Sequence, residues 1–197
     1  MDLALVFKDA LRTLGAKERD PESEALLRRV YADNADVFCP RATYGLYKIA
    51  SFLPEIQLDG YAFPLVGESI RRHLDGASFA LLSAFTLGIA VDKRIRELSL
   101  ARPSESVALN AIASSYAERA ADEMLAEERR KLEADGYETN FRFCPGYGDL
   151  PLRTNEEIAL ALNAQKKIGL TVTAGGALLP RKSIVGIVGV TKSEVKK

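Results

Sequence analysis

The stretch Arg142-Phe143-Cys144-Pro145-Gly146-Tyr147-Gly148-Asp149-Leu150-Pro151-Leu152 combines residue types that suit a small-ligand site. The Pro-Gly turn removes side-chain bulk, so a ligand can approach the main chain. Arg142 can pair with a carboxylate through two parallel hydrogen bonds, and Tyr147 offers an aromatic face and a hydroxyl group. The stretch predicts a site for a ligand with a carboxylate and an adenine-like heterocycle. The alternative is a well-formed turn with Arg142 in a surface ion pair.

Glu118 is a second candidate, because it lies in a helical stretch that carries almost no charge. Between residues 106 and 121 the only charged residues are Glu118 and Arg119, and six positions are alanine. A carboxylate buried there without a partner would cost several kcal/mol. Arg119 points to a different helix face, so the partner is expected elsewhere in the protein or on a ligand. The alternative is a solvated Glu118 on an exposed strip.

The counts of histidine and cysteine exclude several kinds of site. The only two cysteines, Cys39 and Cys144, form no CxxC pattern and no cluster with the single histidine, His73, which excludes zinc fingers and ribbons. We expect two free thiols rather than a disulfide, and Cys144 to be structural or a main-chain contact rather than a nucleophile. His73 fits the last turn of a helix closed by Gly76, where a cation is favourable without a catalytic role.

Composition and patterning exclude further classes. The 197 residues carry 27 basic and 27 acidic side chains, which gives no support to a nucleic-acid binder. No signal peptide or transmembrane segment is expected, and the protein is predicted to be cytoplasmic. No glycine-rich phosphate loop follows a strand, which argues against Rossmann-type methyltransferases and dehydrogenases. The basic residues near the C-terminus are expected to be solvated: Arg181, Lys182, Lys192, Lys196 and Lys197.

Periodicity and turn residues predict an α+β fold. Residues 78–87 and 184–190 read as core strands, and Pro103 opens a long helix that ends near Gly136 and is buried in its first half only. Short extended segments and turns are expected over 38–63, and a short strand over 140–143. The other predicted helices are 3–14, 20–37, 64–74, 89–98 and 155–167. We predict a single domain, residues 1–197, with a mainly antiparallel sheet packed with helices.

The pattern Arg142-x-x-x-Gly146-Tyr147 resembles the S-adenosylmethionine-binding signature of the activation domain of vitamin B12-dependent methionine synthase. Further segments resemble stand-alone members of that family in the expected order, so the resemblance covers nearly the whole chain. These segments are 6–15, 84–88, 117–122, 145–152 and 180–186. The sequence departs from the family after Tyr147, since no later tyrosine can supply the family's C-terminal tyrosine contact.

The resemblance implies a groove for S-adenosylmethionine on a twisted antiparallel sheet. It implies that Arg142 contacts the ligand's carboxylate, that the Cys144 main chain lies beside the adenine, and that Gly146 and Tyr147 complete the turn. Glu118 would pair with the ligand's ammonium group. Cobalamin would be carried by a partner subunit and reduced by one electron, commonly from flavodoxin, before remethylation.

The resemblance therefore predicts an accessory activation subunit for methionine synthase, in methionine biosynthesis, rather than a self-sufficient enzyme. No metal site, nucleic acid or membrane is expected. Two alternatives remain: an activator of another corrinoid-dependent methyltransferase, and a non-catalytic partner-binding module that retains the fold.

Overall fold

The computed structural model describes residues 1–15 and 20–193, so Lys196 and Lys197 lie outside the described residues. The helices and strands in chain order are α1 (Leu3–Thr13), α2 (Pro21–Ala32), the 3-10 helix η1 (Ala35–Val37), β1 (Arg41–Ser51), β2 (Gln57–Leu58), α3 (Glu68–His73), β3 (Phe79–Thr86), α4 (Ile89–Ala101), α5 (Pro103–Ala134), β4 (Tyr137–Thr139), α6 (Thr154–Ala161), α7 (Ala164–Ile168), β5 (Thr171–Val172), β6 (Leu178–Leu179) and β7 (Ser183–Lys192).

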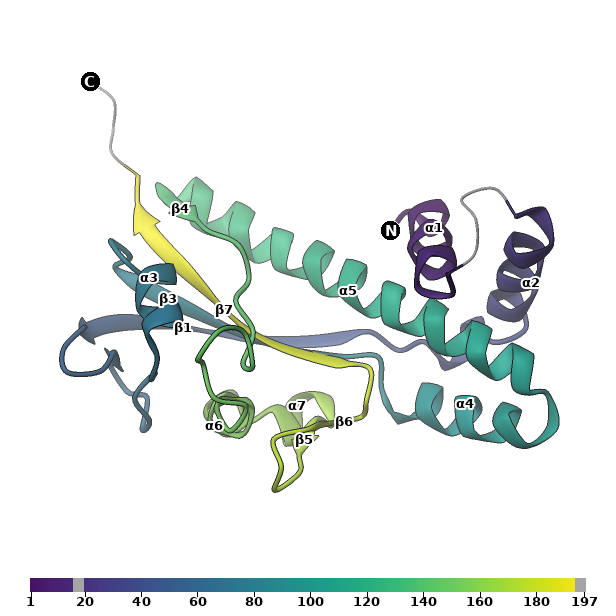
Figure 1. Cartoon of the computed structure of the whole chain (residues 1–197). Helices are drawn as coiled ribbons and strands as arrows, with labels where there is room; N and C mark the ends of the chain where they lie inside the picture. The colour runs from purple at the N-terminus through teal and green to yellow at the C-terminus, as the bar shows by residue number, and fades with distance from the viewer. Residues whose placement is uncertain (16–19, 194–197) are drawn as a thin grey trace.

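A five-stranded antiparallel sheet, in the order β2-β1-β3-β7-β4, forms the centre of the fold. The long helix α5 crosses one face with α1, α2 and α4 packed against it, while α6 and α7 lie on the other face (Figure 1). β5 and β6 form a separate two-stranded ribbon. This architecture confirms the predicted α+β fold with a mainly antiparallel sheet.

The strands β3 and β7 are buried on both faces of the sheet, as their apolar sequences predict. Leu81 and Val188 pack in the cluster beneath the second half of α5, whereas Leu82 and Ile187 pack in the cluster beneath α6 and α7. Alternate residues thus enter opposite cores because a strand's side chains change face at every residue. In the described part of the chain, apolar clusters therefore lie on both faces of the sheet.

α5 follows the prediction closely. Much of the surface of its first half is buried, and its buried residues include Leu109, Ile112 and Ala113. Its charged second half extends beyond α1 and α2 along the sheet (Figure 1). Small alanine side chains let α1, α2 and α4 approach the helix closely. α5 also contacts the edge strand β4.

The first third of the chain differs from the prediction. The helix expected over 20–37 ends at Ala32, because the Asn34 side chain donates to the Val30 carbonyl oxygen at 2.7 Å and a 3-10 turn follows. The short segments expected over 38–63 include one 11-residue strand, β1. Gly45 and many half-exposed residues obscure the alternation of polar and apolar residues in this strand. Pro40 and Pro54 stand in the sequence on either side of it. The helix over 64–74 is confined to Glu68–His73.

Two later elements also differ. The helix expected over 155–167 is divided into α6 and α7 by Asn163, whose φ of 52° is left-handed; asparagine tolerates that conformation better than most residues. The strand expected over 140–143 lies at Tyr137–Thr139, and Phe143 forms only an isolated bridge with Ile187. Among the described residues, no helix is both long and apolar enough to cross a membrane.

Candidate functional site

The Arg142 side chain lies on the α5 face of the sheet because of an irregularity in strand pairing. The edge segment 140–143 has one residue more than the stretch of β7 with which it pairs. The Asn140 N–H donates to the Gly189 carbonyl oxygen at 3.1 Å, and the Gly189 N–H donates to the Asn140 side-chain Oδ1 at 2.7 Å. Phe143 exchanges two main-chain hydrogen bonds with Ile187. Two residues on the edge chain, 141 and 142, thus oppose the single residue Val188. This is the geometry of a β-bulge, which reverses the faces that later side chains occupy.

The bulge determines which side chain enters which core. In β4, Thr139 lies opposite Val190. If that register continued without the bulge, Arg142 would lie opposite Ile187 and point into the apolar core under α6 and α7. The extra residue instead sends Phe143 into that core and places Arg142 over Gly186. A Cβ at Gly186 would lie 2.4 Å from Arg142 Cγ, so the glycine makes room for the arginine stem.

Three charged side chains meet at the end of that stem. Arg142 Nη2 donates to Glu118 Oε2 at 2.5 Å and lies 3.3 Å from Asp122 Oδ1. The Arg142 side chain is 12% exposed, while those of Glu118 and Asp122 are 62% and 65% exposed. The cluster is one cation with two carboxylates, and its acidic side faces solvent.

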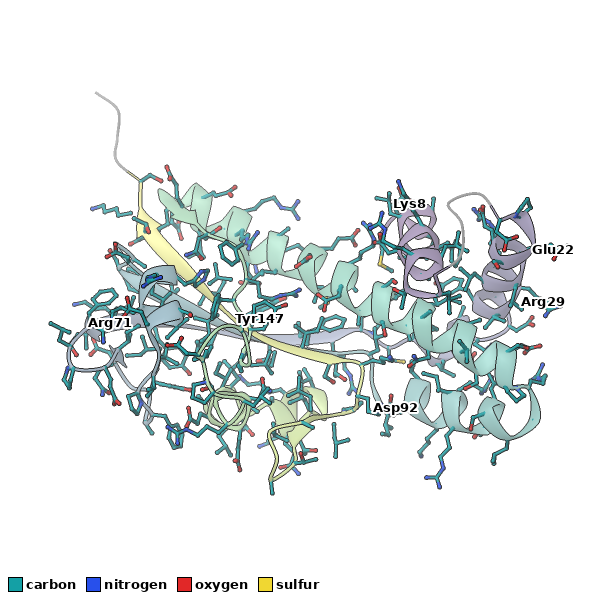
Figure 2. The ribbon with its side chains drawn as sticks, viewed as in Figure 1. Lys8, Glu22, Arg29, Arg71, Asp92 and Tyr147 are labelled. Carbon is teal, nitrogen blue, oxygen red and sulfur yellow. The ribbon has the colours of Figure 1, made fainter. Side chains whose placement is uncertain are left out.

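The turn after Arg142 holds its main chain by local hydrogen bonds. The Tyr147 N–H donates to the Cys144 carbonyl oxygen at 3.0 Å, and the Gly146 N–H donates to the Leu150 carbonyl oxygen at 2.8 Å. Gly146 has a φ of 91°, which favours glycine. Within the described part of the chain, the Cys144 N–H donates no hydrogen bond. This edge of the sheet therefore offers an unused donor next to Tyr147, which is exposed (Figure 2).

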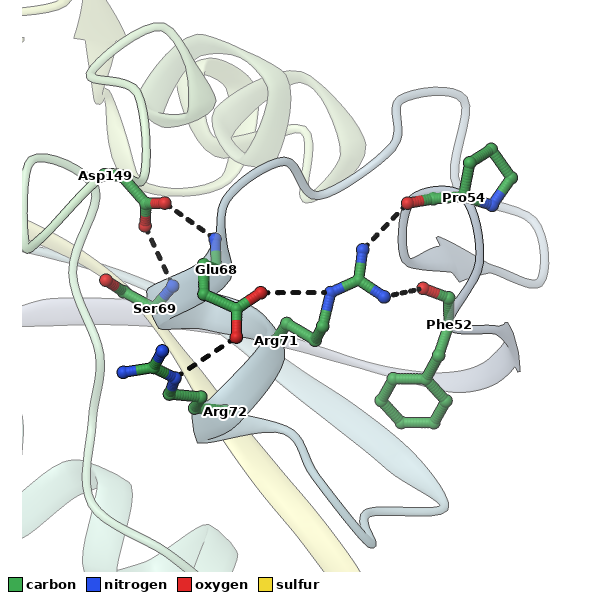
Figure 3. A network of polar contacts seen from close by, with 7 residues as sticks. All are labelled: Phe52, Pro54, Glu68, Ser69, Arg71, Arg72 and Asp149. Carbon is green, nitrogen blue, oxygen red and sulfur yellow. Dashed lines mark hydrogen bonds and ion pairs between the residues drawn. The ribbon is translucent and has the colours of Figure 1, made fainter.

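Asp149 fixes the far side of this turn to α3. Its two carboxylate oxygens accept from the Glu68 and Ser69 N–H groups at 2.7 and 2.8 Å, and Arg71 links the same helix to the Phe52 and Pro54 carbonyl oxygens (Figure 3). These bonds satisfy donors at the start of α3 that have no partner within the helix. The hydrogen bonds hold the pKa of Asp149 at about 2, well below its usual 3.8.

The architecture has a counterpart of known structure. A solved structure described as the MetH reactivation domain bound to AdoHcy shares this fold. The TM-score is 0.67 over 99% of this chain and 77% of that chain, with 18% sequence identity. No protein-family model matches the sequence, and neither does any curated protein. The similarity at this identity shows the fold, and the candidate site lies on that fold.

The five residues predicted for the site lie close together. Glu118 of α5 pairs directly with Arg142, and Cys144, Gly146 and Tyr147 form the adjoining turn. Glu118 is not buried, so the alternative of an exposed carboxylate holds, and Arg142 does form an ion pair. Arg119 pairs with Asp9 of α1 instead, Nε to Oδ2 at 2.8 Å, on a different face of α5.

Cys144 has the character of a structural thiol. Burial raises its pKa above the ordinary value, and the Cys144 sulfur in turn raises the pKa of Tyr147, so both groups remain protonated near neutral pH. A protonated thiol is a weak nucleophile. The two cysteines are free, as expected. His73 packs against Phe141 and Phe143, with ring centroids 4.6 and 4.9 Å apart, and burial lowers its pKa.

Sequence reasoning missed three residues that shape the site: Asp122, Asp149 and Gly186. Asp122 follows Glu118 by four positions, so helical spacing alone could have placed both carboxylates on one face. Asp149 and Gly186 act through long-range contacts, for which the sequence gives no local signal. Within residues 1–15 and 20–193, no cluster of histidine, cysteine, aspartate and glutamate side chains has the geometry to hold a metal ion.

The Asp149 contact predicts an acid-sensitive stability. Because the folded-state pKa lies below the unfolded-state value, this contact stabilises the fold above about pH 4 and is lost as the pH falls through about 2. We expect Asp149→Asn to lower the melting temperature by a few degrees at neutral pH and to weaken the decline between these pH values. Circular dichroism melts over a pH series measure both effects. Asp59→Asn, at an exposed position outside this network, is the control, and an equal change in both variants would contradict the assignment.

Proposed function

We propose that the chain binds S-adenosylmethionine beside Arg142 and presents it to cobalamin held by a partner protein. The observation that carries the proposal is the contact of Arg142 with Glu118 and Asp122 at the edge of the sheet. The similar structure is described as bound to AdoHcy, which is S-adenosylmethionine without its methyl group. The proposed role is activation of B12-dependent methionine synthase, as an accessory component.

The charges of the cluster complement those of the proposed ligand. S-Adenosylmethionine carries a carboxylate, an ammonium group and a sulfonium, so its net charge is positive by one. The cluster of Arg142, Glu118 and Asp122 carries a net charge of minus one. Arg142 would pair with the carboxylate, while Glu118 pairs with the ammonium group and Asp122 contributes a second negative charge. In the free protein Arg142 lies within ion-pair distance of both carboxylates, so binding exchanges one set of ion pairs for another.

The adjoining turn can hold the other end of the ligand. The unused Cys144 N–H can donate to an adenine ring nitrogen. Gly146, with a φ of 91°, gives the adjoining turn the left-handed residue that it needs. Tyr147 offers an aromatic face to the adenosyl group or the sulfonium. Asp149 keeps the turn docked on α3 and so positions Tyr147.

In the proposed reaction this chain would bind and orient S-adenosylmethionine and would not supply a nucleophile. When bound, S-adenosylmethionine supplies a methyl group on a positively charged sulfur, a good leaving group. The partner would supply the cobalt, and a flavodoxin-like protein would supply the electron that reduces it. Cys144 and Tyr147 remain protonated, so they would hold the ligand without competing for its methyl group.

Isothermal titration calorimetry of the whole chain tests the proposal. We expect S-adenosylmethionine to bind, and S-adenosylhomocysteine to bind several-fold more weakly because it lacks the sulfonium charge that the net negative cluster attracts. Methionine and adenosine, titrated separately, control for binding of either half alone. No heat of binding with S-adenosylmethionine at millimolar concentration would contradict the proposal.

The pairing of Arg142 with Glu118 in the free protein favours a second candidate function. Because Arg142 is already paired with Glu118, its guanidinium has a partner without a ligand, as a partner-binding module that retains the fold would require. Capture of cobalamin-binding proteins from methionine synthase and from another corrinoid methyltransferase, with and without S-adenosylmethionine, separates the alternatives. Capture that depends on S-adenosylmethionine favours activation, and the preferred partner identifies the client. Capture that is independent of it favours the module.

A further inference from the structure

A second concave site lies away from the Arg142 turn, between α4, α5 and the turn that leads into β7. Its volume is about 520 Å³, within the range of small-molecule sites in proteins. The lining residues are Ile89, Asp92, Ile95, Arg96, Ser99, Asn110, Leu179, Arg181 and Lys182. Figure 2 places Asp92 on the first turn of α4, beside the chain that enters β7. The cavity therefore joins three segments that are distant in sequence.

The lining has an excess of positive charge. Arg96, Arg181 and Lys182 surround the cavity with Asp92 as the one carboxylate. Across the described ranges 1–15 and 20–193, none of the three cations takes part in an ion pair. Asp92 Oδ2 instead accepts from the Arg181 main-chain N–H at 2.7 Å. The Asp92 contact ties the turn to α4 and leaves the guanidinium of Arg181 free.

Lys182 is the central feature of this site. It was predicted to be a solvated basic residue, and that prediction is wrong: its Nζ donates to Asn110 Oδ1 and Ser114 Oγ of α5, each at 2.7 Å. Both acceptors are neutral, and an ammonium group has three donors, so one donor is left over and neither hydrogen bond supplies a negative charge. Burial lowers the pKa of Lys182, and the Asp92 carboxylate opposes that shift.

We propose that this cavity binds an organic phosphate, a phosphomonoester of metabolite size. A phosphomonoester carries nearly two negative charges at neutral pH, which matches three cations against one carboxylate. Lys182, Arg181 and Arg96 would hold the phosphate oxygens. The Asn110 amide nitrogen, free once Oδ1 accepts from Lys182, adds a neutral donor. Ile89, Ile95 and Leu179 provide an apolar wall for the rest of the molecule.

The phosphate site and the proposed S-adenosylmethionine site lie along one face of α5. Ser114, which accepts from Lys182, precedes Glu118 by one helical turn. They nevertheless use different side chains and opposite net charges. Phosphate binding does not depend on the proposed function, so either proposal can fail while the other stands.

Nuclear magnetic resonance titration of the whole chain with inorganic phosphate, at constant ionic strength in chloride, tests the inference. We expect saturable shifts of the amide signals of Asn110 and residues 181–183. Phenyl phosphate, which adds an apolar ring, is expected to bind several-fold more tightly than inorganic phosphate. No saturation at tens of millimolar phosphate would overturn the site, and equal affinity for the two probes would overturn the assignment of an organic ligand.

Variants separate this cavity from general attraction of anions. We expect Lys182→Met to weaken phosphate binding about tenfold, and Lys93→Met, which removes an exposed cation of α4 outside the cavity, to leave it unchanged. If Lys182→Met fails to fold, Arg181→Gln changes an exposed side chain, and a several-fold loss is expected. Equal affinities in the Arg181 and Lys93 variants would overturn the proposal.

Discussion

Arg142→Met is expected to weaken the binding of S-adenosylmethionine strongly while leaving the chain folded. The methionine side chain retains an apolar stem that can lie over Gly186, and it removes the guanidinium that would pair with the ligand's carboxylate. The remaining Glu118 and Asp122 would then repel that carboxylate. Loss of a charge-assisted, two-point contact together with this repulsion predicts a decrease in affinity of at least about tenfold.

Calorimetry with matched variants checks this expectation. Arg72→Met is the control, because Arg72 also pairs with a glutamate, Glu68, but lies exposed on α3 away from the cluster. Arg142→Lys keeps the charge and loses the planar fork, so an intermediate affinity is expected. Wild-type affinity in Arg142→Met, with an unchanged melting temperature, would remove Arg142 from the binding site.

Glu118→Gln extends the same experiment to the other half of the amino-acid group. If Glu118 holds the ligand's ammonium group, Glu118→Gln weakens binding even though Arg142 is then less tightly held by its neighbour. If Glu118 only restrains Arg142, releasing the guanidinium strengthens binding. The sign of the change therefore distinguishes a ligand contact from an internal ion pair.

Local pattern was sufficient to predict the elements whose burial is complete or regular. β3 and β7 are apolar runs between turn residues, and α5 begins at a proline and ends before a left-handed glycine, Gly136. The fold class follows from these elements. The resemblance added the residues of the turn, and the structure brings Glu118, Arg142, Cys144, Gly146 and Tyr147 together at one edge of the sheet.

The features that the sequence did not predict depend on pairing between distant segments. The β1 strand lies beside the two-residue strand β2 on one side and is only partly covered, so its polar and apolar residues do not alternate. The register shift between residues 140 and 143 exists only relative to β7, and no local property of Arg142 shows that it faces α5 rather than the opposite core. A register can be known only once the partner strand is known.

Gly186→Ala is expected to damage the site and the fold together. The added Cβ would lie 2.4 Å from Arg142 Cγ and 2.8 Å from its Cδ. These atoms belong to the stem of a side chain that is 12% exposed, so they cannot move aside freely. We expect a loss of about 1–3 kcal/mol in the free energy of unfolding, as for overpacked cores, and loss of the Arg142–Glu118 contact with a matching loss of affinity for S-adenosylmethionine.

A double-mutant cycle identifies the cause of this loss. Chemical denaturation of Gly186→Ala, Arg142→Ala and the double variant is compared with Gly175→Ala, where the nearest neighbour of an added Cβ is Thr173 Oγ1 at 4.0 Å. Arg142→Ala removes the clashing stem, so Gly186→Ala is expected to cost little in that background. A cost that persists without the arginine would place the strain in β7 itself. Recovery in the double variant would instead show that the glycine is required because the register shift puts an arginine, rather than a small apolar residue, on this face of the sheet.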